Sequence, residues 1–198
     1  MSDIPFWMRV AALVALMACV AGIDLWCRRE KAKRWKEYLF ILATGCAGAV
    51  FGSMTDLVTS SISPEYFIFG KELPEEGLRA NAMILGLQAG FSAGIIAGAL
   101  CLFVGMRKRT AAIKMPKVFL LAWRPLLLAI ILGASVPFAC SWFDPFGFVE
   151  HLTRPLGPES AEKFLIVWHI HLGVYLGLGL GLMWMIAKLL KLPVDSGA

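Results

Sequence analysis

Charged residues are scarce in this sequence of 198 residues: they make up 17% of it, whereas 59% is hydrophobic. Soluble domains average about 25% charged and about 45–50% apolar residues. The composition therefore excludes a soluble enzyme, a disordered chain and a small secreted protein held together by disulfides. The apolar excess is concentrated in stretches of about 20 residues, the length that a helix needs to cross a bilayer.

Common motifs of catalysis and nucleotide binding are also missing. The chain has no phosphate-binding loop, dinucleotide fingerprint, nucleophile elbow or HExxH pattern. Its five cysteines form no CxxC pair, so neither a zinc site nor a disulfide framework is indicated. We therefore expect a small multi-pass membrane protein with no cofactor.

Five apolar segments qualify as membrane spans, and all of them predict helices. Strands of a membrane barrel would be about 10 residues long and would alternate in hydropathy, which these segments do not do. We expect an all-α polytopic membrane helix bundle that forms a single domain over residues 1–198, because its links are too short for a soluble domain. The predicted spans are approximately residues 6–26, 38–57, 80–104, 118–140 and 164–187.

The sign of the charge alternates from one link to the next. The links after the first and third spans and the C-terminal tail are basic, whereas the links after the second and fourth spans are acidic on balance. Because basic residues stay on the cytoplasmic side, we predict the N-terminus outside and the C-terminus in the cytoplasm. The net charge of +5 has the same origin, so we expect contact with the lipid bilayer and not with nucleic acid. Six basic residues just after the first span favour a retained helix over a cleaved signal peptide.

Glycines recur at intervals of four in three of the predicted spans. In lipid, where little hydrophobic force holds helices together, such small residues let two backbones approach closely. We interpret them as helix-packing faces used within the chain, or alternatively for self-association or as a sliding interface in a carrier. The faces comprise Gly48 and Gly52 in the second span, Gly86, Gly90, Gly94 and Gly98 in the third, and Gly173, Gly177 and Gly181 in the fifth.

Asp56 is the main candidate for a binding residue. It lies at the outer end of the second span, in the hydroxyl-rich stretch of residues 52–61. Ionisable residues inside membranes are candidates for function, and this carboxylate could bind a cation, pair with Arg79 or cap the next segment. Gln88 is a polar residue near the glycine face of the third span, and in a carrier or channel it would share a polar path with Asp56.

The three histidines are His151 in the outer link, and His169 and His171 in the fifth span. Imidazole is a common ligand of metals and haem. Residues two apart on a helix point about 200° from each other, so His169 and His171 cannot share one ligand face. A metal site that combines these histidines with Asp56 or Glu65 remains an alternative to hydrogen-bonded packing.

Two motifs lie in residues 48–105, one around the end of the second span and one in the third. They read Gly52-x-x-x-Asp56-x-Val58-Thr59 with Ile62-Ser63-Pro64-Glu65-Tyr66-Phe67, and Leu85-Gly86-x-x-Ala89 with Gly94-x-x-x-Gly98. The region resembles an uncharacterised group of bacterial multi-pass membrane proteins, although that group has paired tryptophans where this chain has Phe91-Ser92. The resemblance implies a bacterial inner membrane and no particular activity. It singles out Asp56, Glu65, Tyr66 and Phe67 as candidate binding residues.

Three functions are compatible with this pattern. The first is a non-enzymatic accessory or assembly subunit, in a homo-oligomer or a larger membrane complex. The second is a small carrier or channel, and the third is a metal-dependent membrane enzyme acting at the outer face. Carriers usually place polar groups near the middle of the membrane, whereas the centres of these spans are almost entirely apolar, which favours the first.

Overall fold

The computed structural model describes residues 4–32, 34–107 and 115–191. Within these ranges the protein consists of seven α-helices and one short 3-10 segment, Arg29–Lys31, with no strand. The helices are α1 (Phe6–Arg28), α2 (Arg34–Ile62), α3 (Pro64–Lys71), α4 (Leu78–Arg107), α5 (Met115–Ala139), α6 (Phe148–Leu156) and α7 (Pro158–Lys191).

Five of these helices, α1, α2, α4, α5 and α7, are long and apolar enough to cross a membrane. The predicted all-α fold and five long apolar helices are therefore confirmed over the described ranges. Several helices extend past the predicted spans; α7 begins at Pro158 and α2 continues to Ile62. Hydropathy marks only the apolar stretch, and a helix can continue into the polar interface, where the exposed side chains contact water.

Large apolar side chains stay exposed on all five long helices. Examples are Ile23, Val50, Ile96, Ile130 and Met183, one from each helix. Such a surface would cause aggregation in water, whereas the acyl chains of a bilayer cover it. The exposure agrees with a multi-pass membrane protein.

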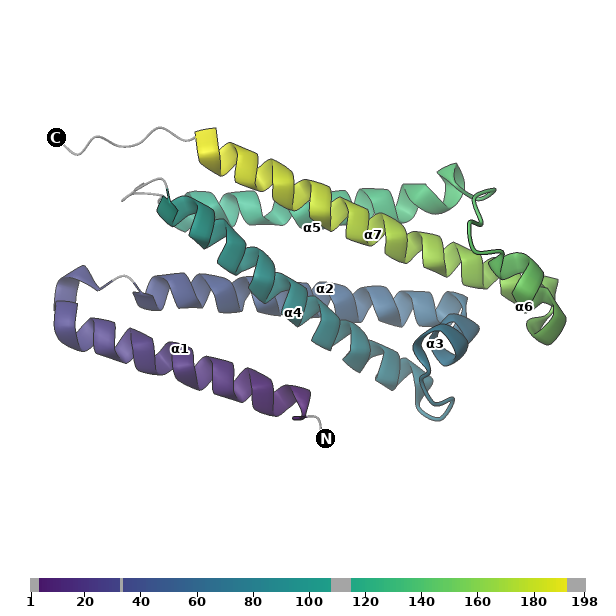
Figure 1. The fold of residues 1–198 in the computed structure, drawn as a ribbon, viewed down its shortest axis with the longest axis horizontal. Helices are drawn as coiled ribbons and strands as arrows, with labels where there is room; N and C mark the ends of the chain where they lie inside the picture. The colour runs from purple at the N-terminus through teal and green to yellow at the C-terminus, as the bar shows by residue number, and fades with distance from the viewer. Residues whose placement is uncertain (1–3, 33, 108–114, 192–198) are drawn as a thin grey trace.

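Two antiparallel helix pairs, α2 with α4 and α5 with α7, form the body of the protein (Figure 1). Contacts within each pair are extensive, and those between the pairs are sparse. Helix α1 lies at the edge of the bundle and packs mainly on α2. Asp24 is its only buried residue, and the Asp24 carboxylate accepts from the Arg34 backbone N–H at 3.0 Å.

Backbone-to-backbone contact between glycines joins α2 to α4. A Cβ added at Gly90 would overlap the carbonyl oxygen of Gly48, and one at Gly86 would overlap that of Gly52. Further along the same interface, a Cβ at Gly94 would overlap the carbonyl oxygen of Thr44. Only glycine permits this approach, so the interval of four in the sequence corresponds to one continuous interface.

The glycines of α7 pack on α5 in the same way. A Cβ at Gly173 would overlap the carbonyl oxygen of Leu132, and one at Gly181 would overlap Cα of Pro125. Between them, a Cβ at Gly177 would lie 2.5 Å from Cα of Ala129. Both glycine faces are thus occupied by partner helices of the same chain.

The short helices α3 and α6 cover one end of the two pairs (Figure 1). Ser63 caps α3 by accepting a hydrogen bond from the Tyr66 N–H at 3.3 Å, and Pro64 occupies the first helical position. Asp144 caps α6, where it accepts hydrogen bonds from two backbone N–H groups at 2.8 and 2.9 Å.

A candidate ligand cavity ending on a buried aspartate–histidine pair

Asp56 of α2 and His171 of α7 join the two helix pairs through a buried polar contact. The Asp56 Oδ1 atom lies 3.0 Å from His171 Nε2. Their exposed fractions are only 8% and 5%, so bulk water hardly reaches either side chain. The two residues are 115 positions apart in the sequence, and the turn at α3 and the return through α5 bring them together.

The second ring nitrogen of His171 defines where its proton lies. Nδ1 is 2.9 Å from the carbonyl oxygen of Val167, one turn earlier in α7. A carbonyl oxygen can only accept a hydrogen bond, so Nδ1 must carry a hydrogen. Nε2 is therefore either a donor to an ionised Asp56 or an acceptor from a protonated Asp56.

Tyr66 of α3 covers one side of this pair. Its ring stacks on the His171 imidazole, with the centroids 5.0 Å apart and the planes 20° apart. Burial raises the pKa of the Tyr66 phenol, and Tyr175 and Asp56 add smaller effects in the same direction. The phenol therefore stays neutral at physiological pH and keeps its hydroxyl hydrogen.

The sequence motif around Tyr66 positions this ring. Glu65 accepts hydrogen bonds from the hydroxyls of Ser63 and of Ser160 in α7, both at 3.1 Å. Phe67 is fully buried, and its ring meets the His171 imidazole edge-on at 6.1 Å between centroids. Three of the candidate residues, Glu65, Tyr66 and Phe67, thus hold α3 against α7 directly above the Asp56–His171 pair.

A cavity of about 670 Å³ lies between the two helix pairs, and it is partly open to the surroundings, because its lining residues Ile96 and Tyr175 are 60% and 58% exposed. This volume is within the usual range of small-molecule sites, about 300–1,000 Å³. Asp56, His171 and Tyr175 line one end of it, and Phe40, Cys101 and Met185 line the other. The walls between these ends are mostly apolar and combine small residues with larger ones, and Thr44 and Thr55 add two hydroxyls; the walls include Ala43, Ala47, Gly48, Ala89, Ala93, Phe51, Trp123, Leu126 and Leu178.

Gly86 makes room for the carboxylate at the polar end. A Cβ added at this glycine would lie 2.8 Å from Asp56 Oδ2. Among the described residues, no donor reaches Oδ2, whereas Oδ1 is engaged with His171. The cavity therefore ends on a carboxyl oxygen that can still accept a hydrogen bond or face a cation.

The other sequence candidates lie elsewhere. Gln88 is not among the residues that line the cavity, so the structure does not place it on a common path with Asp56. His169 is buried, and its Nε2 lies 2.9 Å from the carbonyl oxygen of Phe143, whereas His151 is exposed on α6. In residues 4–32, 34–107 and 115–191, no group of three His, Cys, Asp or Glu side chains is placed to hold a metal.

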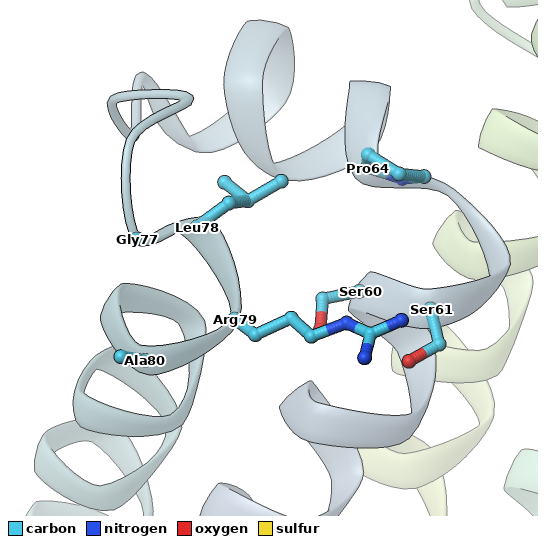
Figure 2. Close-up of a pocket in the computed structure, with 7 residues that line it drawn as sticks. All are labelled: Ser60, Ser61, Pro64, Gly77, Leu78, Arg79 and Ala80. Carbon is cyan, nitrogen blue, oxygen red and sulfur yellow. The ribbon is translucent and has the colours of Figure 1, made fainter.

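Arg79 does not pair with Asp56. It lines a separate hollow of about 510 Å³ at the junction of α2, α3 and α4. Figure 2 shows its side chain extending toward Ser60 and Ser61, with Pro64 above them. The interpretation of Asp56 as a partner of Arg79 is therefore wrong, and its partner is His171.

Sequence reasoning did not find the partner of Asp56 or the contribution of Tyr175. The signal for α3 was present, because Ser63-Pro64-Glu65 is a typical helix start. Nothing in the spacing of His171 connects it with Asp56. Comparison with models of known protein families, with curated proteins and with solved structures finds no match, so function has to be argued from this site alone.

Proposed function

We propose that the protein is a small membrane carrier that binds an amphipathic molecule between its two helix pairs. The observation that supports this most is an apolar cavity that ends on a buried Asp56–His171 pair. Binding sites for small molecules are typically concave and apolar with a few polar groups that fix orientation. The cavity between the helix pairs is concave and mainly apolar, and Asp56 and His171 supply polar groups at one end.

The shape of the cavity favours a ligand with a long apolar part and one polar head. Its lining runs along α2 from Phe40 to Asp56, which is about 24 Å at the rise of an α-helix. The ionisable pair Asp56–His171 lies at one end, whereas the sulfur atoms of Cys101 and Met185, 3.8 Å apart, lie with Phe40 at the other end. A chain-like molecule would therefore lie along the helices with its head against Asp56.

An accessory or assembly subunit is less well supported. That hypothesis depended on glycine faces as surfaces for other chains, and these faces are occupied by α4 and α5 of the same protein. Exposed apolar side chains remain, but a lipid bilayer covers them without any protein partner. No arrangement of the described residues favours a metal-dependent enzyme.

The charge pattern supports an orientation for this carrier. The acidic links and the helices α3 and α6 would face outward, and the basic links and the C-terminus would face the cytoplasm. The Asp56–His171 pair would then lie toward the outer side of a bacterial inner membrane. The apolar end of the cavity would point inward.

Native mass spectrometry on protein extracted in mild detergent from its own membrane tests the proposal. We expect a bound amphiphile as extra mass on the 21.7 kDa chain. The double variant Ala47→Leu with Ala93→Leu should lose it, because both side chains line the cavity and the larger ones fill it. Ala99→Leu is the matched control, since Ala99 is exposed on α4 and does not line the cavity.

Two results would contradict the proposal. The first is a wild-type protein that carries no bound molecule under conditions in which it stays folded. The second is a double variant that folds and retains the same extra mass as Ala99→Leu. A mass that matches another protein chain would instead restore the accessory-subunit hypothesis.

A further inference from the structure

The distance of 3.0 Å between His171 Nε2 and Asp56 Oδ1 is that of a hydrogen bond, which requires one hydrogen between the two atoms. Nδ1 of His171 is committed to the Val167 carbonyl, so the proton between Nε2 and Asp56 Oδ1 is the only one the pair can exchange. Whether this proton lies on nitrogen or on oxygen, the pair carries no net charge. If it leaves, a carboxylate faces the lone pair of Nε2 across 3.0 Å.

Helix α3 places one cation near the pair: the Lys71 ammonium lies over the Tyr66 ring, 5.6 Å from its centroid, whereas none of the residues that line the cavity is a lysine or an arginine. The titratable groups that face it are the phenols of Tyr66 from α3 and Tyr175 from α7. Helix α4 contributes Gly86 at this point, and the described part of α5 contributes only apolar residues and Trp123 to the cavity lining. The remaining titratable residue of the lining is Cys101, at the opposite end.

A positive charge inside the cavity would stabilise the deprotonated pair directly. It could lie against the carboxylate of Asp56, which lines the cavity and whose Oδ2 accepts no hydrogen bond from the described residues. The ring of Tyr175 lies beside it, with its centroid 6.3 Å from that of His171, and aromatic faces attract organic cations. The cation then takes over the electrostatic role of the proton.

We propose that the site selects an amphipathic organic cation and exchanges it for one proton; this rests on the proposed function. The proton leaves the Nε2–Oδ1 contact for the aqueous phase. His171 stays neutral with its hydrogen on Nδ1, and Asp56 becomes the counter-ion of the ligand. One positive charge enters and one leaves, so the net charge of this buried site stays the same.

The sign of the pH dependence follows from this exchange. Because binding releases a proton, a lower proton concentration favours the bound state, and affinity for the cation rises with pH. One released proton corresponds to about a tenfold gain in affinity per pH unit. An anionic head would require the site to gain a proton, so its affinity would change in the opposite direction.

Isothermal titration calorimetry with three probes of equal chain length tests the proposal. The probes are dodecyltrimethylammonium, dodecanol and dodecanoate, added to the protein in phosphatidylcholine nanodiscs. Titrations in two buffers of different ionisation enthalpy count the protons released. The quaternary ammonium has no proton to lose, so any released proton comes from the protein.

We expect the ammonium to bind more tightly than dodecanol and to release about one proton per molecule bound. Asp56→Asn should remove both the preference for the cation and the pH dependence, because an amide has no charge to offer. Glu159→Gln is the matched control: this exposed carboxylate pairs with Lys163 outside the cavity and should change neither value. The wild-type proton count does not depend on either variant folding.

The outcomes separate this proposal from the proposed function. Equal binding of dodecanol and the ammonium without proton release would overturn the cation exchange and leave the amphiphile cavity standing. Tighter binding of dodecanoate, with proton uptake, would overturn it in favour of an anionic ligand. If no probe binds the wild type more tightly than the Ala47→Leu, Ala93→Leu variant, the proposed function fails as well.

Discussion

The contacts inside each helix pair differ in kind from the contacts between the pairs. Within α2 and α4, glycines place backbone against backbone, so that a single added methyl group has no room. Between the pairs, alanines and glycines line a partly open cavity of about 670 Å³ together with larger side chains such as Phe51, Trp123 and Leu126. The same small residue types thus produce close packing in one place and a cavity in the other.

This difference indicates which parts of the protein can move. A backbone-to-backbone interface has no side chains to rearrange, so each pair should behave as one rigid unit. The sparse contacts between the pairs, with the Asp56–His171 contact at one end, permit small shifts of one unit against the other. Carriers commonly work through such rocking of rigid units around a binding site.

We expect the largest loss of folded protein from Gly90→Leu, which disrupts the closest backbone contact between α2 and α4. Its Cβ would overlap the Gly48 carbonyl oxygen, and the rest of the side chain would force α2 and α4 apart. We expect loss of folded protein, measured as the yield of monodisperse protein after gel filtration in detergent. Gly22→Leu is the control, because nothing lies within 4 Å of a Cβ at that position in α1. Normal yield of both variants would show that α2 and α4 do not pack as described.

We expect an intermediate loss of thermal stability from a substitution in the interface between α5 and α7. Gly177→Ala brings a Cβ to 2.5 Å from Cα of Ala129, whereas Gly179→Ala meets nothing within 4 Å. Overpacking of this kind costs about 1–3 kcal/mol, so the first variant should unfold at a lower temperature. The second should be neutral or slightly more stable, since alanine favours a helix more than glycine does. Equal melting temperatures for the two variants would contradict the packing of α7 on α5.

We expect the smallest loss of stability from a substitution at the start of α3, the helix that covers the Asp56–His171 end of the cavity. Ser63→Ala removes the cap of α3 and should cost about 1 kcal/mol of stability. Hydrogen exchange should increase in α3, where Tyr66 stacks on His171, and stay unchanged in the α2–α4 interface. The control is Ser61→Ala, an exposed residue whose hydroxyl contacts only the Leu57 carbonyl oxygen. Faster exchange throughout α2 and α4 in Ser63→Ala would show that α3 and the pair are not separate units.

The long helices were predictable from the sequence because each depends on local information. About 20 apolar residues define a span whatever the rest of the chain does, and a glycine at every fourth position defines a close-packing face. The sequence did not indicate which partner helix each glycine face packs against. Gly90 meets Gly48, and Gly177 meets Ala129, in pairs of helices that are connected through the short helices α3 and α6.

The candidate site was predictable only in part. Asp56 was identified because a carboxylate at a membrane span is costly without a role, and the Glu65-Tyr66-Phe67 run because it resembles a known motif. His171 was considered as a metal ligand and turned out to pair with Asp56. The two residues belong to different helix pairs, so only the tertiary structure brings them together.

The most direct test of the central claim is a crystal structure of the protein purified with its native lipids and grown in a lipidic phase. The claim is that two tightly packed helix pairs form between them a partly open ligand cavity that ends on Asp56 and His171. We expect elongated density between the pairs, running from these two side chains toward Cys101 and Met185. A structure in which α5 and α7 pack directly on α2 and α4, with no space between them, would contradict the claim.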